Sequence, residues 1–175
     1  QYDLKPGEIP DMKRAINWKD DYAAYKHIKA IIRDYKPHIV HTHAAKPGAI
    51  GRLAASNCEV PVILHTFHGH VFHSYFGKMK SAFYVQAERY LAAKTDRIIA
   101  ISEQQKDELT REFNICPADK MSVIPLGLDL DKFYTDQQNK RSIFRSRYRV
   151  NDDEILIGII GRIVPVKNHA MFLEA

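Results

Sequence analysis

The sequence has few cysteines and no long apolar run, and each absence excludes a class of protein. Its two cysteines, Cys58 and Cys116, are far apart and form no C-x-x-C motif. They therefore indicate neither a disulfide framework nor a zinc ribbon, and they suit a reduced protein of the cytoplasm. No stretch reaches the roughly 18 consecutive apolar residues of a membrane-spanning helix. The first residue is not a methionine, so we expect the chain to begin inside a longer protein.

The overall composition is that of a globular protein with a mildly basic surface. Of the 175 residues, 45% are hydrophobic and 27% are charged, which is typical of a folded domain rather than a disordered chain. The net charge of +5 favours an anionic ligand or an anionic membrane surface. No RNP, helix-turn-helix or zinc-finger pattern accompanies this charge, so the sequence does not indicate a nucleic-acid partner.

Strand and helix patterns alternate along most of the chain. Such alternation predicts an α/β fold with a Rossmann-like parallel sheet and helices on both faces. The helix expected over residues 77–95 has an inner stripe at Met79, Phe83, Ala87, Tyr90 and Leu91. Strands are expected at residues 38–43, 61–67, 97–102, 121–125 and 155–161, and helices at 20–36, 49–56, 77–95, 103–113 and from 168 onward.

Histidines gather where two of the expected strands end. His43 closes the strand at 38–43, and His68 and His70 follow the strand at 61–67, with Gly69 allowing a tight turn between them. Ligands of open parallel sheets bind outside the carboxyl ends of the strands. We therefore expect a cleft at this edge, with His68 pointing into it and with His43, Lys46 and His70 placed to meet a substrate.

Two other functions remain open on the residues alone. The pairs His41-x-His43 and His68-x-His70 resemble ligand pairs of a metal-dependent hydrolase. Metal sites usually also recruit carboxylates or cysteines, and residues 35–57 contain no aspartate, glutamate or cysteine. The second alternative is a non-catalytic binding module built on an incomplete Rossmann unit.

Several loop motifs in a fixed order resemble family 4 of the retaining glycosyltransferases, which have the GT-B fold. The motifs are H-I-V-H-T-H, A-A-K-P-G-A-I-G-R-L-A-A, H-T-F-H-G-H-V-F, I-A-I-S-E, V-I-P-L-G-L-D-L-D-K-F and G-R-I-V-P-V-K-N. The resemblance implies transfer of a sugar from a nucleoside-diphosphate sugar to an acceptor hydroxyl with retention, in the synthesis of a cell-surface polysaccharide or glycolipid. It implies no metal and no cofactor. Sugar phosphorylases and sugar-phosphate synthases share the fold and remain open.

The resemblance also implies a domain organisation. Residues 1–135 correspond to most of the acceptor-binding Rossmann-like domain, whose first strand and glycine-rich loop would precede residue 1. Residues 136–154 would be a linker, and residues 155–175 the start of the donor-binding domain. The paired glutamates that hold the donor in this family would follow residue 175. We therefore expect the 175-residue chain to be inactive by itself, since half of the cleft would be absent.

Site residues follow from the same resemblance. His68 matches the family's histidine near the donor sugar and is the expected catalytic residue. Arg162 and Lys167 match the positions that bind the donor diphosphate, which suits a bidentate guanidinium and an ammonium. Gly161 lets the backbone leave the expected strand just before them.

The stretch after the second histidine loop predicts contact with a membrane. Phe72, Tyr75 and Phe76 lie beside Lys78 and Lys80. Aromatic rings with adjacent cations are typical of membrane interfaces. We therefore expect a lipid-linked acceptor and peripheral binding at the inner face of the membrane.

Overall fold

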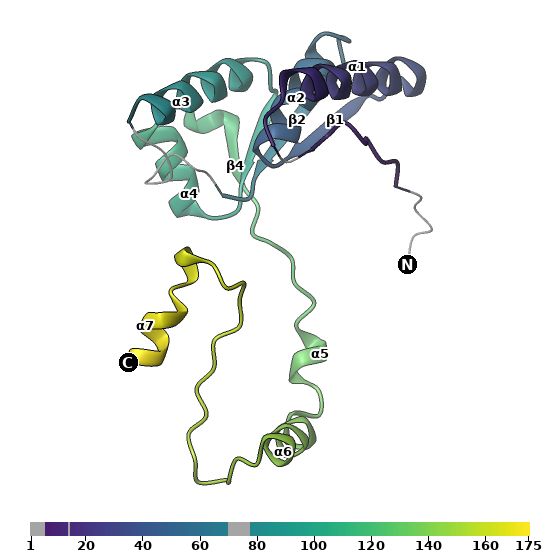
Figure 1. Cartoon of the computed structure of the whole chain (residues 1–175). Coiled ribbons are helices and arrows are strands. Elements are labelled where there is room, and N and C mark those ends of the chain that lie inside the picture. The colour runs from purple at the N-terminus through teal and green to yellow at the C-terminus, as the bar shows by residue number, and fades with distance from the viewer. Residues whose placement is uncertain (1–5, 14, 70–77) are drawn as a thin grey trace. The chain divides into compact units, whose positions relative to one another are not determined.

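The computed structural model describes residues 6–13, 15–69 and 78–175. The chain divides into two compact units, Gln1–Leu126 and Gly127–Ala175. Figure 1 shows the helices and strands of both units.

Unit 1 is built around a parallel sheet of four strands. The strands are β1 (Ile39–His43), β2 (Val62–Phe67), β3 (Arg97–Ala100) and β4 (Met121–Val123), and they lie side by side in that order. The register pairs His43 with Thr66, and Phe67 with Ala100. The predicted α/β class with a parallel sheet is confirmed. The helices are α1 (Trp18–Tyr35), α2 (Ala45–Ser56), α3 (Lys78–Ala93) and α4 (Glu103–Asp107), which continues as a π-helical turn (Glu108–Glu112).

The first helix shows why these segments adopt their structure. The side chain of Asn17 accepts hydrogen bonds from the backbone N–H groups of Lys19 and Asp20 and so caps α1. Asp20 and Asp21 lie in the first turn, where acidic side chains interact favourably with the helix dipole. The helix ends at Lys36, which is left-handed and precedes Pro37, a residue that disfavours helical geometry before it.

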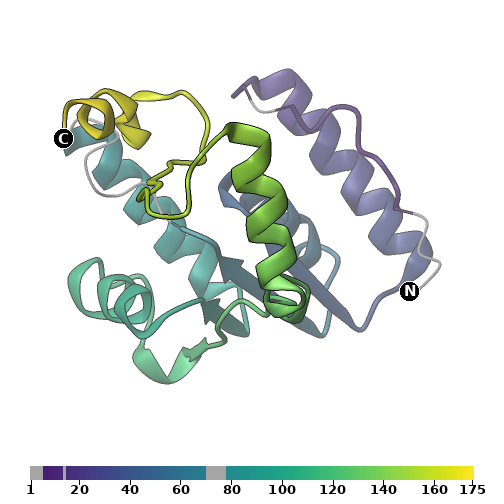
Figure 2. The same ribbon diagram turned by 90° about the horizontal axis from the view of Figure 1, so that it is seen from below.

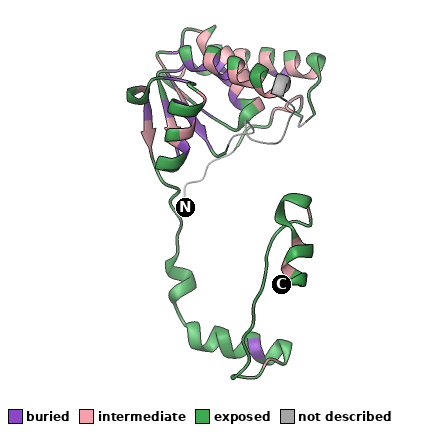
Figure 3. Ribbon diagram, turned by 90° about the vertical axis from the view of Figure 1, so that its left-hand side faces the viewer, coloured by how far each residue is buried: buried purple, intermediate pink, exposed green. Residues whose placement is uncertain are grey.

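The core lies between the helices and one face of the sheet. One buried cluster joins α1 and α2 to this face and the other joins α3 and the π-helical turn to it; Figure 2 shows the sheet and these helices from below. The buried residues concentrate in unit 1 (Figure 3). We expected helices on both faces. Consecutive parallel strands joined by right-handed crossovers instead place their connecting helices on the same face. The clusters contain Ile32, Ala54, Ala55, Val60 and Ile63, and Phe67, Ala92, Ile98, Ala100, Leu109, Ile115, Cys116 and Met121.

Helix α3 presents a different face to the core from the one that its apolar pattern predicts. Phe83 and Tyr90 are 70% and 58% exposed, whereas Glu88 is buried. The predicted inner stripe is therefore wrong at these two aromatic residues, although Leu91 is buried as expected. The reason is that Glu88 makes a buried ion pair with Arg52 of α2, which turns the charged residue inward.

Unit 2 contains short helices and an apolar segment without a ladder partner. The helices are α5 (Asp131–Tyr134), α6 (Gln137–Tyr148), a 3₁₀ turn (Pro165–Lys167) and α7 (His169–Glu174). The predicted strand at residues 155–161 is wrong for this chain, because residues 155–160 form no strand and Ile160 is fully exposed. A strand must pair its backbone groups with a neighbour, and no described residue of unit 2 is in a strand.

Candidate functional site

Two histidines from neighbouring strands meet at the carboxyl edge of the sheet. His43 is the last residue of β1, and His68 follows directly after β2. Nδ1 of His43 lies 2.9 Å from Nε2 of His68, and the ring centroids are 5.1 Å apart. Both side chains are exposed. The structure thus brings together the expected catalytic histidine and one of the expected acceptor residues in a position open to a ligand.

The hydrogen bond limits how the two rings can be protonated. One of the facing nitrogens, Nδ1 of His43 or Nε2 of His68, must carry the proton and the other must accept it. The pair can therefore hold one additional proton and keep its hydrogen bond, but it cannot keep the bond with both facing nitrogens protonated. Such a pair can donate to, or accept from, a sugar hydroxyl near neutral pH.

A third histidine, His41, lies beside the pair. The ring of His41 is centred 4.3 Å from that of His43, and its Nε2 lies 2.8 Å from Oγ1 of Thr66. Burial, followed by the nearby His43 and His68, lowers the pKa of His41 below its usual value. A positive charge on the His41 ring is therefore disfavoured.

Beneath the exposed pair lies a buried histidine that the sequence analysis did not assign. His65 of β2 is 1% exposed, and its Nδ1 lies 2.9 Å from Oγ1 of Thr42. Burial, followed by the charge of Arg52, lowers the pKa of His65 to about 3. Its ring is therefore neutral at physiological pH and serves as a packed, hydrogen-bonded part of the core.

Lys46 is held by groups of the N-terminal segment. Its ammonium donates to the backbone carbonyls of Lys13 (2.7 Å) and Ala15 (2.5 Å) and forms an ion pair with Asp21. These contacts tie Lys13, Ala15 and Asp21 to the first turn of α2. The structure thus places Lys46 close to His43 in the chain but with its three N–H donors already engaged.

The backbone between His43 and α2 is strained. Ala44 has φ 61° and ψ 165°, a combination that is almost restricted to glycine. Strained backbone concentrates at functional sites, where the surrounding structure holds it in place. The position of Ala44, directly after His43, agrees with a site at this edge of the sheet.

The expected donor residues lie in unit 2. The side chain of Lys167 passes beside Gly161, where an added Cβ would lie 3.6 Å from its Cγ. The carbonyl of Arg162 accepts a hydrogen bond from Nε2 of His169 at 3.0 Å, and the side chains of Arg162 and Lys167 are exposed. Gly161 and Lys167 are therefore close, and both cations are accessible to solvent.

Some expected site residues fall outside the described residues. These are His70 of the expected acceptor site and Phe72, Tyr75 and Phe76 of the expected membrane contact. Lys78 and Lys80 lie in α3, but the structure does not describe their side chains. Among the described residues, no group of three or more His, Cys, Asp or Glu side chains is placed to hold a metal ion. No helix in the described part of the chain is long and apolar enough to cross a membrane.

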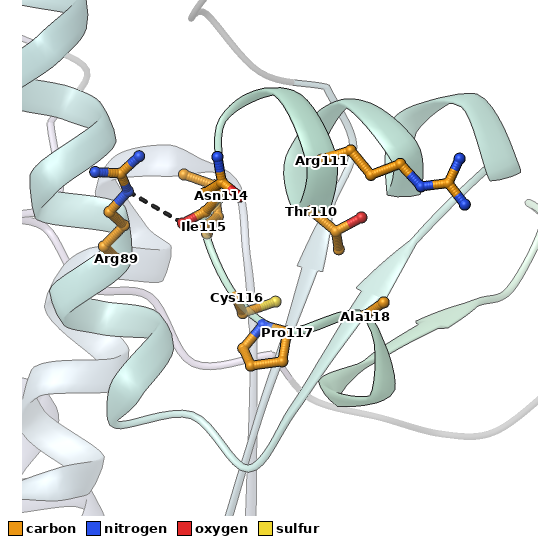
Figure 4. A pocket seen from close by; sticks show the side chains of 8 residues that line it. All are labelled: Arg89, Thr110, Arg111, Asn114, Ile115, Cys116, Pro117 and Ala118. Carbon is orange, nitrogen blue, oxygen red and sulfur yellow. Dashed lines mark hydrogen bonds between the residues drawn. The ribbon is translucent and has the colours of Figure 1, made fainter.

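A separate hollow lies between α3 and the loop that precedes β4. Its volume is about 480 Å³, and Figure 4 shows its lining side chains. Arg89 closes one side by donating to the carbonyls of Phe113 (2.7 Å) and Asn114 (3.1 Å). Burial raises the pKa of the Cys116 thiol in this hollow, which disfavours the reactive thiolate. On this side of the hollow, Nε and Nη2 of Arg89 are thus engaged with backbone carbonyls.

The match to a family model decides the family. Residues 6–132 match the model of Glycosyltransferase Family 4. The chain belongs to Glycosyltransferase Family 4. The metal-hydrolase and binding-module alternatives are therefore not favoured. Family 4 membership also agrees with the loop motifs that begin at H-I-V-H-T-H, and it places the histidine pair in the matched region.

Two similar curated proteins are glycosyltransferases by name. The chain is 32% identical over 167 residues to the UDP-Gal:alpha-D-GlcNAc-diphosphoundecaprenol alpha-1,3-galactosyltransferase of Escherichia coli, covering 95% of this chain and 43% of the relative. It is 28% identical to the capsular polysaccharide biosynthesis glycosyltransferase CapM of Staphylococcus aureus, covering 95% and 44%. The chain thus spans less than half the length of these relatives.

Solved structures of low sequence identity share the fold. A sucrose-phosphate synthase from Thermosynechococcus elongatus superposes with a TM-score of 0.53 at 19% identity, covering 76% of this chain and 67% of that one. The UDP-GlcNAc 2-epimerase of Neisseria meningitidis superposes with a TM-score of 0.50 at 20% identity, covering 81% and 38%. These likenesses confirm the expected GT-B type of Rossmann-like fold.

Proposed function

We propose that the protein containing this chain transfers a sugar from a nucleoside-diphosphate sugar to an acceptor hydroxyl, with retention of the anomeric configuration. The observation that carries the proposal is the hydrogen-bonded pair of His43 and His68, which lies at the carboxyl edge of the sheet in a Family 4 chain. Ligands of such sheets bind at that edge. Exposed imidazoles there can hydrogen-bond to sugar hydroxyls in either direction.

Each side of the reaction has its own residues in this proposal. His68 contacts the donor sugar at the reacting centre, and His43 and His70 contact the acceptor. Lys46 belongs to the acceptor side, where its ammonium would exchange one of its present partners to touch a ligand directly. Arg162 and Lys167 neutralise the diphosphate as the sugar leaves, and Gly161 lies directly before Arg162 and beside the Lys167 side chain.

The acceptor in this proposal is a lipid-linked sugar of a polysaccharide or glycolipid pathway. The support is the name of the Escherichia coli relative, which specifies a UDP-Gal donor and a diphosphoundecaprenol acceptor, together with the capsular role named for CapM. Contact with the membrane would then occur through Phe72, Tyr75, Phe76, Lys78 and Lys80. Vesicle flotation tests this contact: recovery should be higher with anionic than with neutral vesicles, and equal recovery would refute it.

Product analysis tests the proposed reaction. The intact protein is incubated with UDP-, GDP- and TDP-sugars and with lipid-diphosphate-linked acceptors, and the product linkage is determined by proton NMR. We expect one donor to be consumed and the new bond to keep the donor's anomeric configuration. An inverted linkage would refute retention, and the absence of transfer with every donor would refute the proposal.

The proposal also concerns the 175-residue chain by itself. Catalysis of glycosyl transfer needs groups positioned on both sides of the reacting centre, and this chain spans 43% of the Escherichia coli relative. We expect the chain alone to show no sugar transfer under conditions in which the intact protein is active. Turnover by the chain alone would show that the residues described here suffice.

A further inference from the structure

A buried ion pair joins α2 to α3. The Arg52 side chain is 0% exposed, and its Nη2 lies 2.8 Å from Oε2 of Glu88. Its Nε donates to the carbonyl of Gly48, one turn earlier in α2, at 3.0 Å. Nη1 of Arg52 is buried and has no hydrogen-bond partner among the described residues. The guanidinium therefore joins α3 to the first half of α2 without satisfying all of its own donors.

Stability alone is a poor explanation for such a pair. Removing two charges from water costs several kcal/mol per ion, and apolar residues of similar volume are often as stable or more stable at the same place. An unpartnered buried donor adds a further cost of about 1–3 kcal/mol. A pair retained at such cost is better explained by the geometry that it fixes.

The geometry in question is the distance of α2 from the sheet. A Cβ on Gly48 would lie 2.5 Å from Cε1 of His65, and a Cβ on Gly51 would lie 2.8 Å from Cγ2 of Thr42. The helix therefore rests directly on these two side chains. The Gly48 carbonyl accepts a hydrogen bond from Arg52 Nε, and the His65 ring packs against the same glycine.

The two side chains under α2 connect the strands that carry the histidine pair. The Thr42 hydroxyl donates to the carbonyl of Leu64 at 3.1 Å. Because a hydroxyl has one proton, the 2.9 Å contact between Thr42 Oγ1 and His65 Nδ1 must be donated by Nδ1. This hydrogen bond links β1 to β2 in addition to the backbone ladder. Thr42 directly precedes His43, and His65 lies three residues before His68.

We propose that Arg52, Glu88, His65 and Thr42 form a positioning network that holds His43 and His68 at hydrogen-bonding distance. The ion pair holds α2 against His65. The His65–Thr42 hydrogen bond then fixes β1 relative to β2, and the ends of these strands place the two exposed imidazoles at hydrogen-bonding distance. None of the four touches a ligand. This proposal rests on the proposed function, because the pair that the four buried residues align is the pair used in sugar transfer.

The protonation of individual ring nitrogens tests the network without any turnover. Long-range proton–nitrogen NMR spectra of the 175-residue chain show which imidazole nitrogens carry a proton. In the unaltered chain we expect complementary states, with one facing nitrogen of the His43–His68 pair protonated and the other not. The variants are Thr42→Val, which keeps the shape but removes the hydroxyl, Thr42→Ser, which keeps the hydroxyl, and Arg52→Met.

A change in the second core cluster supplies the matched control. Leu109→Ala is expected to destabilise the chain by about 2–5 kcal/mol, and Leu109 belongs to the cluster of Ile98, Ile115 and Met121 rather than to the network itself. We expect folded Thr42→Val and Arg52→Met to give mixed tautomers at His43 and His68, and Thr42→Ser and Leu109→Ala to keep the complementary states.

Two results would overturn the network. One is an unchanged pair of tautomers in folded Thr42→Val. The other is an equal loss of the complementary states in Leu109→Ala, which would show that any destabilisation produces the effect. If Arg52→Met does not fold, Thr42→Val decides the question. Failure of sugar transfer in the intact protein would leave this test standing, because it measures the rings themselves.

Discussion

Gly48 of α2 lies so close to His65 of β2 that the smallest possible side chain on Gly48 would collide with the imidazole. The Cβ of an alanine at this position would be 2.5 Å from Cε1 of the ring, and both residues are buried. Gly48→Ala should therefore force α2 away from the sheet and destabilise unit 1 by about 1–3 kcal/mol. Urea unfolding followed by circular dichroism measures the change.

Gly7→Ala is the control for this prediction, because a Cβ on Gly7 meets nothing within 4 Å. We expect it to change the free energy of unfolding by less than about 1 kcal/mol. Equal stability of the Gly48→Ala variant and the unaltered chain would show that α2 does not rest on His65.

Acid should destabilise the chain through the His65 ring. The folded-state pKa of His65 is about 3, whereas its ordinary value is 6.5, so the unfolded chain binds a proton that the folded chain does not. Stability is therefore unaffected by this group above about pH 6.5 and falls by roughly 1.4 kcal/mol per pH unit below it. His65→Gln, which cannot titrate, should flatten the decline between pH 6 and 4. The same decline in both proteins would contradict the assignment.

The strain at Ala44 predicts a stabilising glycine. Ala44 has φ 61° and ψ 165°, where a side chain costs about 1–3 kcal/mol and glycine costs little. Ala44→Gly loses part of this gain to the greater freedom of the unfolded chain. We expect a net stabilisation of up to about 1 kcal/mol by thermal or urea unfolding. A loss of stability by 1 kcal/mol or more would show that the strain is absent.

The fold and part of the site could be predicted from the sequence because their causes are local. Alternating apolar strands and amphipathic helices predict the parallel sheet, and parallel strands end at one edge, which brings His43 and His68 together. Gly48 and Gly51 in a helix of small residues signal its close approach to the sheet. Arg52 is a cation among the small residues of that helix and so indicates a buried ion pair. The sequence does not identify the acidic partner of this cation.

The features that the sequence did not predict depend on distant partners. The orientation of α3 follows from the Arg52–Glu88 pair, whose members are 36 residues apart, rather than from the positions of Phe83 and Tyr90. The contacts of Lys46 depend on Lys13 and Ala15, which lie 33 and 31 residues earlier in the chain. The apolar segment 155–160 has the composition of a strand, but a strand forms only beside another strand.

Loss of a cation at the donor side should slow transfer without unfolding the protein. Arg162 and Lys167 are exposed in unit 2, so removing either side chain leaves no cavity. In the intact protein we expect Arg162→Ala and Lys167→Ala each to cost roughly 3 kcal/mol of transition-state stabilisation, about 100-fold in kcat/KM. Arg141 is an exposed cation of α6, and the control Arg141→Ala should leave kcat/KM unchanged. Parental rates in both single variants would remove the donor assignment.

The exchange of His68 for alanine in the intact protein tests the central claim most directly. Initial rates are measured with the preferred nucleotide sugar at saturating acceptor, and circular dichroism confirms that the variant is folded. If the histidine pair lies at the reacting centre, His68→Ala should lower kcat by about 100-fold or more, whereas replacing the exposed His27 of α1 by alanine should leave it unchanged. A kcat within twofold of the parental value in folded His68→Ala would contradict the assignment of sugar transfer to this edge of the sheet.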